Sequence, residues 1–322
     1  MVRKMSNTSP LPTSPLPVPR SPRGEAPSGD PGRRYPPGRG GAPNYWAIVP
    51  AAGIGRRMGS DKPKQYLPLN GIPILERTVA RLANHPATSG VVVAIADNDI
   101  WWPTLDLSSV ASRFEKTKTG EKEMAVAVPV PLEPGREALT NPPHGAPVYL
   151  AEGGAERCHS VLNALDTALD PRIGARKKDW VLVHDAVRPC LRHGDVDRLI
   201  AALSGHPVGG LLGVRVRDTM KRANGEDDVV ETVEREGLWH ALTPQMFRLG
   251  ALFEALSACI RRGILVTDET QAMELWAGES GAPMPRMVEG ADDNIKVTRP
   301  GDLALAGFYL QRQEETGASG RD

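Results

Sequence analysis

The amino-acid sequence predicts an α/β protein in which helices cover both faces of a mostly parallel sheet. Short apolar runs alternate along the chain with longer segments that have a helical spacing of apolar residues. Several of these runs are apolar on both faces, which is typical of parallel strands buried between two layers of helices. Ligands bind such sheets beyond the carboxyl ends of the strands, so the residues that follow each strand are the first candidates for a functional site.

The expected elements follow one another from residue 44 to residue 313, which we interpret as one domain. The strands are expected at residues 46–49, 89–97, 147–154, 179–189, 209–216, 238–242 and 294–298. The helices are expected at residues 74–85, 155–169, 247–262, 268–277 and 301–313.

Composition and charge exclude several classes of protein. The 322 residues include 39 basic and 39 acidic side chains, so no overall positive charge favours nucleic acid as a partner. The chain has no apolar run near the ~20 residues of a membrane span. Its three cysteines, Cys158, Cys190 and Cys259, form no C-x-x-C pair, which argues against a disulfide framework or a zinc site. We therefore expect a cytoplasmic protein with neither a nucleic-acid nor a membrane partner.

Both ends of the chain lie outside the predicted domain. Residues 1–43 are rich in proline, serine, glycine and arginine and have too little apolar surface to offset the entropy of ordering. We expect a disordered tail or a wrongly assigned start. An organelle-targeting segment stays open because the stretch is basic and nearly free of acids, although its prolines oppose an amphipathic helix. Residues 314–322 form a short C-terminal tail.

Two internal segments interrupt the alternation of strands and helices. Residues 98–146 are long, contain prolines and have weak periodicity, so we expect a mobile insertion with Trp101 and Trp102 pinning one end to the body. Residues 217–236 are too polar for a core, and the pair Asn224-Gly225 indicates a hairpin. A polar hairpin that projects from an α/β body is a candidate dimerisation arm.

The loop after the first expected strand is the strongest candidate site. Ala51, Ala52 and Gly53 leave the backbone open to close approach by a ligand, and its N–H groups could hold phosphates. The cations that follow would supply the opposite charge, and they are Arg56, Arg57, Lys62 and Lys64. The glycine spacing does not match G-x-G-x-x-G, and the G-K-[ST] ending of a Walker A loop is missing. A solvated basic loop is the alternative to a phosphate-binding one.

Polar groups also follow two later strands. Gly153 and Gly154, with the Ser160 hydroxyl, either read the edge of a base or form only a tight turn before a helix. In the sequence HDAVRP, Asp185 and Arg188 stand just beyond an apolar strand. The Asp185 carboxylate could hold a metal, a ribose or a substrate hydroxyl, or it could cap the next turn.

Further downstream, single residues have competing interpretations. Lys296 lies between Ile295 and Val297, a poor place for a surface lysine unless that face meets solvent or an active site. Arg217 could form an ordinary salt bridge of the arm. Asp268 is expected to cap a helix rather than bind a metal. The histidines have no H-E-x-x-H or comparable metal-binding spacing.

Taken together and in order, these stretches resemble the 2-C-methyl-D-erythritol 4-phosphate cytidylyltransferases of the non-mevalonate isoprenoid pathway. The matching segments are PAAGIGRRM with PKQY, GG-x-x-R-x-x-S, VLVHDAVRP, RDTMKR, LWHALTPQ and DNIKVTRPGDLALA. The resemblance implies a Rossmann-like nucleotidyltransferase fold with a projecting β-arm, and a homodimer joined through residues 217–236. It also implies transfer of CMP from CTP to 2-C-methyl-D-erythritol 4-phosphate with Mg²⁺, whose protein ligands stay unknown.

The resemblance also assigns roles to individual residues. Arg57 and Lys64 would stabilise the transition state. Arg217 and Lys296 would position the methylerythritol phosphate, with Arg217 serving the partner's site. Asp185 and Arg188 would lie on the substrate side. The residues matching nucleotide-contacting positions are Ala51, Ala52, Gly53, Gly154 and Ser160.

These residue types suit a reaction between two anions. The attacking group is a phosphate oxygen that is already mostly ionised at neutral pH, since its second pKa lies near ~6. The site must neutralise charge and align the reactants for direct in-line attack, which arginine and lysine can do. Two other functions stay open: cytidylyl transfer to ribitol 5-phosphate, and nucleotide binding by a regulator without catalytic activity.

Overall fold

The computed structural model describes residues 43–53, 62–107, 114–119, 122–127 and 145–317, with the segments 114–119 and 122–127 described by their backbone alone. Arg57 and the predicted tail, apart from residue 43, lie outside these ranges, as do 318–322 of the predicted C-terminal tail.

The described residues form a nine-stranded sheet in the order β13-β9-β12-β8-β1-β4-β7-β6-β5. Its inner strands β1, β4, β7 and β8 pair in parallel, whereas β12 runs antiparallel to both β8 and β9. The strand bounds are β1 Tyr45–Pro50, β4 Thr88–Ile95, β5 Phe114–Thr119, β6 Lys122–Ala127, β7 Val148–Glu152, β8 Trp180–Val183, β9 Gly209–Arg215, β12 Trp239–Arg248 and β13 Arg286–Glu289. The mostly parallel sheet that the sequence predicts is confirmed.

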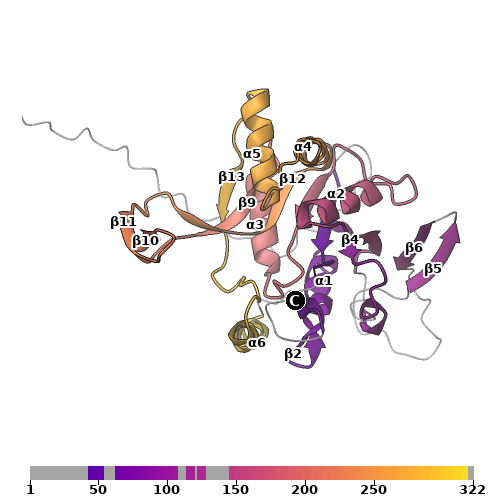
Figure 1. Ribbon diagram of the computed structural model, residues 1–322. Helices are drawn as coiled ribbons and strands as arrows, with labels where there is room; N and C mark the ends of the chain where they lie inside the picture. The colour runs from indigo at the N-terminus through magenta and orange to yellow at the C-terminus, as the bar shows by residue number, and fades with distance from the viewer. Residues whose placement is uncertain (1–42, 54–61, 108–113, 120–121, 128–144, 318–322) are drawn as a thin grey trace, which may run out of the picture. The chain divides into compact units, whose positions relative to one another are not determined.

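Helices cover both faces of this sheet (Figure 1). Because side chains of a strand alternate between faces, Ala47 and Val49 of β1 pack with α1 and α3, while Trp46 and Ile48 pack with α2 and α4. The helix bounds are α1 Ile74–Ala83, α2 Arg157–Ala168, α3 His193–Leu203, α4 Leu249–Arg261, α5 Glu269–Ser280 and α6 Pro300–Glu315. Short elements are the 3-10 helices η2 Lys64–Tyr66 and η3 Trp102–Thr104 and the strands β2 Pro68–Leu69 and β3 Ile72–Pro73. In the described ranges no helix combines the length and apolar character needed to cross a bilayer.

The strand predicted at residues 294–298 is wrong. These residues join no ladder, and the edge strand parallel to β9 is β13 instead. Val297 is fully buried between the exposed Lys296 and the partly buried Thr298, and its amide donates to the Val187 carbonyl (2.9 Å). The alternation of buried and less buried residues resembles the pattern of a strand. The segment nevertheless crosses the carboxyl end of β8 and does not join the sheet.

The two interruptions of the pattern contain strands of their own. Within 98–146, β5 and β6 form a hairpin, and β6 pairs with β7. Trp102 is buried in the core beside Trp101, which confirms that the tryptophans anchor the start of this segment. Within 217–236, β10 Met220–Ala223 and β11 Val229–Val233 form the predicted hairpin. Most of the hairpin's side chains are exposed, as expected of an arm.

Candidate active site

A pocket of about 510 Å³ lies beyond the carboxyl ends of β1, β7 and β8. This is where the sequence predicts the polar segments to converge. The predicted site residues that line the pocket are Ala51, Ala52, Gly53, Lys64, Gly154, Ser160, Asp185 and Lys296. Arg188 and Arg217 are not among its lining residues, and Arg57 lies outside the described residues.

The small-residue loop after β1 is held in place by Gln65. The buried Gln65 side chain donates hydrogen bonds to the carbonyls of Ala51 (2.6 Å) and Gly53 (2.9 Å). Gln65 belongs to η2, so these bonds tie the loop to the turn that carries Lys64. Gln65 has no role predicted from the sequence, although it falls in the motif PKQY. A glutamine directly after a site lysine is the signal that could have found it.

The glycine pair after β7 is required by close packing. A Cβ atom on Gly153 would lie 2.2 Å from the Ala52 Cβ, and one on Gly154 would lie 2.3 Å from the His159 Cβ. The Gly154 amide donates to the Ser160 hydroxyl (3.0 Å), which in turn donates to the Glu156 carbonyl (3.2 Å). The tight turn at the start of α2 is thus confirmed, and recognition of a base by these groups stays a prediction.

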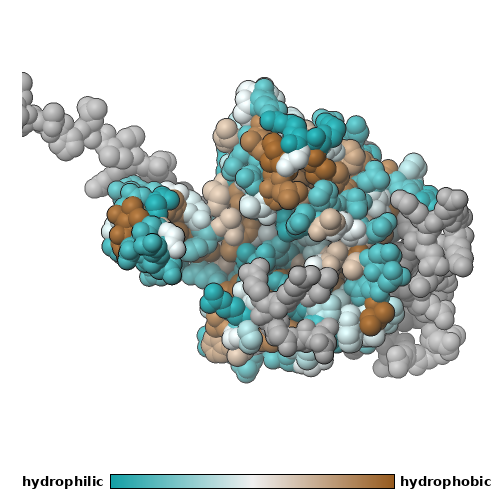
Figure 2. Space-filling model, in the orientation of Figure 1, coloured by the Kyte–Doolittle hydropathy of each residue, from teal (hydrophilic) through white to brown (hydrophobic). Residues whose placement is uncertain are grey.

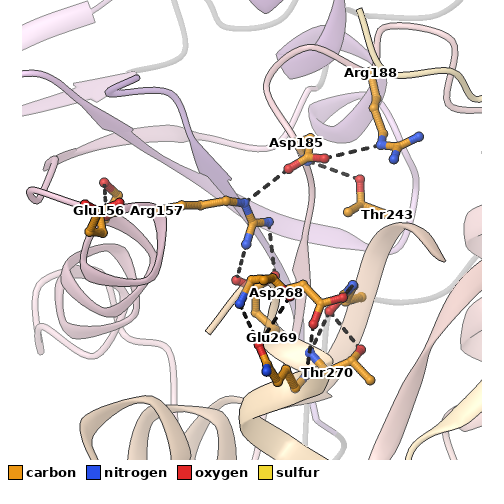
Figure 3. A network of polar contacts seen from close by, with 12 residues as sticks. Glu156, Arg157, Asp185, Arg188, Thr243, Asp268, Glu269 and Thr270 are labelled. Atoms are coloured by element: carbon orange, nitrogen blue, oxygen red, sulfur yellow. Dashed lines mark hydrogen bonds and ion pairs between the residues drawn. The ribbon is translucent and has the colours of Figure 1, made fainter. Parts of the chain in front are cut away.

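Asp185 lies at the centre of a network of charges on the pocket wall (Figure 3). Its Oδ1 is 3.2 Å from Arg157 Nε, and its Oδ2 is 3.0 Å from Lys296 Nζ and 3.3 Å from Arg188 Nε. Burial alone would raise the pKa of Asp185, but the charges of Arg157, Lys296 and Arg188 outweigh it and hold the pKa well below its usual range. The carboxylate is therefore ionised and fixes three cations.

Arg157 is a pocket residue that the sequence analysis did not assign. Its guanidinium donates to both oxygens of the buried Glu269, from Nη1 at 2.6 Å and from Nη2 at 3.1 Å. Arg157 is the arginine of the motif GG-x-x-R-x-x-S, but a single sequence does not show that it pairs with a carboxylate of α5. Asp268, directly before Glu269, caps α5 by accepting from the Gln271 amide, as predicted.

His184 and Thr243 brace the backbone beneath Asp185. His184 is fully buried, and burial lowers its pKa to about 4. A neutral ring has one donor, which must be Nε2 because it faces the Arg188 carbonyl (3.0 Å). The Thr243 hydroxyl then donates to Nδ1 (2.9 Å) and accepts from the Asp185 amide (3.1 Å). This histidine positions the turn and has no proton to exchange near neutral pH.

The remaining two predicted cations lie in different surroundings. Arg188 is buried, and its Nη1 donates to the Asn294 carbonyl (2.7 Å), which anchors the segment that carries Lys296. The Arg217 side chain is 72% exposed at the base of the arm, where Nη1 pairs with the exposed Asp292 (2.9 Å). The structure therefore brings Lys64 and Lys296 to one pocket and leaves Arg217 outside it.

The donor set of the pocket does not fit a magnesium ion held by protein groups. Asp185 already faces three cations, and the other carboxylate on the lining is Glu156. Across the described ranges no group of three or more histidine, cysteine, aspartate or glutamate side chains could hold a metal. Mg²⁺ commonly binds through substrate phosphates with few protein ligands, and that is the mode this wall allows.

Fold and pocket together define the class of the protein. A doubly wound sheet with a small-residue loop after its first strand, facing two lysines across one pocket, is typical of an enzyme that handles phosphorylated nucleotides.

Comparisons with known proteins identify the family within this class. The model of the IspD family, 2-C-methyl-D-erythritol 4-phosphate cytidylyltransferase, matches residues 45–111 and 121–312. Proteins of that name from Aeromonas hydrophila and Vibrio vulnificus are 48% and 45% identical to the chain, each over 84% of its length and over 91% and 95% of theirs. The crystal structure of the Francisella tularensis cytidylyltransferase has a TM-score of 0.60 at 31% identity and covers 83% of this chain and 100% of its own.

The chain therefore belongs to the 2-C-methyl-D-erythritol 4-phosphate cytidylyltransferase family and is a nucleotidyltransferase. The resemblance and the Rossmann-like fold expected from the sequence are both confirmed.

Proposed function

We propose that this enzyme transfers CMP from CTP to 2-C-methyl-D-erythritol 4-phosphate and releases pyrophosphate. The observation that carries the proposal is the pocket that joins the loop after β1 to Lys64 and Lys296. The names of its relatives supply the acceptor. With this acceptor, the enzyme would act in isoprenoid biosynthesis by the non-mevalonate route. Its three buried free cysteines suit a reducing compartment such as the cytoplasm.

The proposed chemistry is a direct in-line displacement. A phosphate oxygen of the acceptor attacks the α-phosphorus of CTP, and the bond from that phosphorus to the bridging oxygen of the leaving pyrophosphate breaks. The acceptor needs no general base because its phosphate is mostly ionised above pH ~6. His184 is held neutral in the interior, and burial raises the pKa of Cys190 to about 12. Neither group suits a covalent intermediate, which supports direct transfer.

The cations would act by compensating charge. Lys64 would face the phosphates of CTP, together with Arg57, and Lys296 would hold the acceptor phosphate. Asp185 keeps the Lys296 ammonium at 3.0 Å, so the cation is already oriented before substrate binds. Such preorganisation avoids the cost of reorienting groups during the reaction.

Magnesium would enter the pocket as part of the nucleotide substrate. The carboxylate on the wall is occupied by cations, so the triphosphate would be the main ligand of the ion. The protein groups would then bind the Mg²⁺–CTP complex rather than a resident metal.

We further propose that two copies of the chain share the acceptor site. Arg217 lies outside the pocket of its own chain, at the base of the hairpin β10–β11. Figure 2 shows a hydrophobic group on this hairpin, where Val229 and Val230 are 65% and 61% exposed. A homodimer joined through the arm would cover these valines and could bring Arg217 to the partner's pocket.

Pyrophosphate release with a panel of substrates tests the proposal. Release is expected with CTP, Mg²⁺ and 2-C-methyl-D-erythritol 4-phosphate, and much less with UTP. A higher kcat/KM with ribitol 5-phosphate would assign the enzyme to the alternative acceptor. CTP binding without turnover of either acceptor would indicate a nucleotide-binding regulator.

A further inference from the structure

We propose that Glu269 is a positioning residue of this enzyme, which holds Arg157 against Asp185 and thereby sets Lys296 for the acceptor phosphate. The proposal rests on the proposed function and adds a residue of α5 to it. Figure 3 shows Glu269 reaching from the start of α5 to Arg157 at the start of α2, with Asp185 on the other side of the guanidinium.

Glu269 is not needed to begin its own helix. The N-cap of α5 is Asp268, which accepts from the Gln271 amide (2.9 Å). The Glu269 side chain is instead only 1% exposed, and its carboxylate pairs with Arg157 of another helix, α2. A buried carboxylate is costly to desolvate, and a buried ion pair adds little net stability compared with apolar packing. Stabilisation of the fold is therefore a weak explanation of the contact between Glu269 and Arg157. Holding Arg157 in position explains it better.

The contact fixes the guanidinium of Arg157 in one plane. Both terminal nitrogens donate to Glu269, at 2.6 and 3.1 Å, and Nε donates to Asp185 at 3.2 Å. A planar group held on two sides by carboxylates has little rotational freedom. Arg157 is 27% exposed and lines the pocket, so this fixed guanidinium belongs to the wall that substrate meets.

The orientation of Asp185 depends on this arrangement. Arg157 takes Oδ1, which leaves Oδ2 for Lys296 and Arg188. Without Glu269, the guanidinium could rotate to take both oxygens of Asp185 or to pair with a substrate phosphate. In the first case Lys296 would lose its partner, and in the second the acceptor would bind out of line. Both outcomes affect the acceptor more than the nucleotide.

The first test is steady-state kinetics of Glu269→Gln, which keeps the size of the side chain and removes its charge. We expect the KM for the acceptor to rise about tenfold, as for the loss of one hydrogen bond to a charged group, with a much smaller change for CTP. Glu269→Asp keeps the charge and should recover part of the loss. Equal KM values for the acceptor in wild type and a folded Glu269→Gln enzyme would overturn the proposal.

The matched control is Asp268→Asn at the same helix start. Asparagine can still cap α5, while the contact of Asp268 with Gln245 (2.9 Å) is lost. This variant should lower the Tm and leave both KM values unchanged. If Asp268→Asn shifts the acceptor KM as much as Glu269→Gln does, the effect comes from disturbing the helix and the proposal fails.

A double-mutant cycle tests whether Glu269 acts through Arg157. The variant Arg157→Gln should lose activity by itself, and adding Glu269→Gln should cost no further kcat/KM if the two act as a unit. Additive losses would overturn the proposal. The double variant also removes the buried charge of Glu269 together with its partner charge on Arg157, so it can fold even where Glu269→Gln alone does not. An inactive wild type would instead contradict the proposed function. The same cycle would then be read from the affinity of the protein for 2-C-methyl-D-erythritol 4-phosphate in a binding assay, where coupling between the two positions still supports the pair and its absence refutes it.

Discussion

Lys296 and Arg217 are expected to hold the same phosphate, yet the structure places them in opposite surroundings. Lys296 lines the pocket and pairs with a buried carboxylate. Arg217 lies at the base of the arm, 72% exposed, and pairs with Asp292, whose side chain is 56% exposed. The Lys296 side chain, 40% exposed, is held against a buried carboxylate, whereas Arg217 is paired with an exposed one.

The difference shows that one chain supplies Lys296 to its own pocket but does not supply Arg217. An exposed ion pair contributes only about 0–1 kcal/mol, so Arg217 can exchange Asp292 for a phosphate at little cost. Lys296 is instead fixed by Asp185, which Arg157 and Arg188 also hold. We infer that the charge network around the buried Asp185 supplies the rigid part of the site and the arm supplies a movable one.

The largest effect is expected for Lys296→Ala. Removing a preorganised cation from a site of this kind should lower kcat by about 10²–10³. The fold should persist because Arg157 and Arg188 still compensate Asp185. Pyrophosphate release measures the rate, and the Tm checks the fold. A loss below about tenfold in a folded variant would mean that Lys296 does not carry the acceptor side of the site.

The buried side of the site should also make stability depend on pH. The pKa of His184 falls to about 4 because the ring is buried, whereas the unfolded value is about 6.5. The unfolded chain therefore binds a proton first, and stability is lost as pH falls from 6.5 to 4. The contribution of this residue is on the order of 3 kcal/mol.

Urea unfolding of wild type and His184→Gln at pH 7 and pH 4.5 measures this contribution. The variant should lose less stability between the two pH values than wild type does. Part of the dependence will remain, since burial also lowers the pKa of His193 to about 4. Equal pH dependence in both proteins would show that His184 is not held neutral beneath Asp185.

An intermediate effect is expected for Arg217→Ala on the exposed side. Loss of one charged hydrogen bond to the acceptor should reduce kcat/KM by about 10- to 100-fold. Arg262→Ala, which removes an exposed arginine paired with Glu279, is the matched control and should leave the rate unchanged. If two copies share the site, mixing Arg217→Ala with Lys64→Ala subunits should restore some activity. A mixture as inactive as its parents would contradict sharing.

Most of the sheet and the pocket could be predicted from the sequence because both depend on local patterns. The apolar runs identify the parallel strands, and the loops after them contain the small and charged residues that line the pocket. The contact between Arg157 and Glu269 could not be predicted, because it joins helices 112 residues apart. The sequence predicts a site role for Lys296 from a wrong local reason, since Lys296 lines the pocket although its segment is not a strand.

The smallest effect is expected for Asp292→Asn, which removes the partner of Arg217 within its own chain. Because both side chains are mostly exposed, stability should change by less than about 0.5 kcal/mol. If Arg217 must leave Asp292 to reach the acceptor, the variant should bind the acceptor equally well or slightly better. A large rise in the acceptor KM would mean that Asp292 orients Arg217 for binding. The exposed side would then be as preorganised as the buried one, and the contrast between the two cations would not describe how the site works.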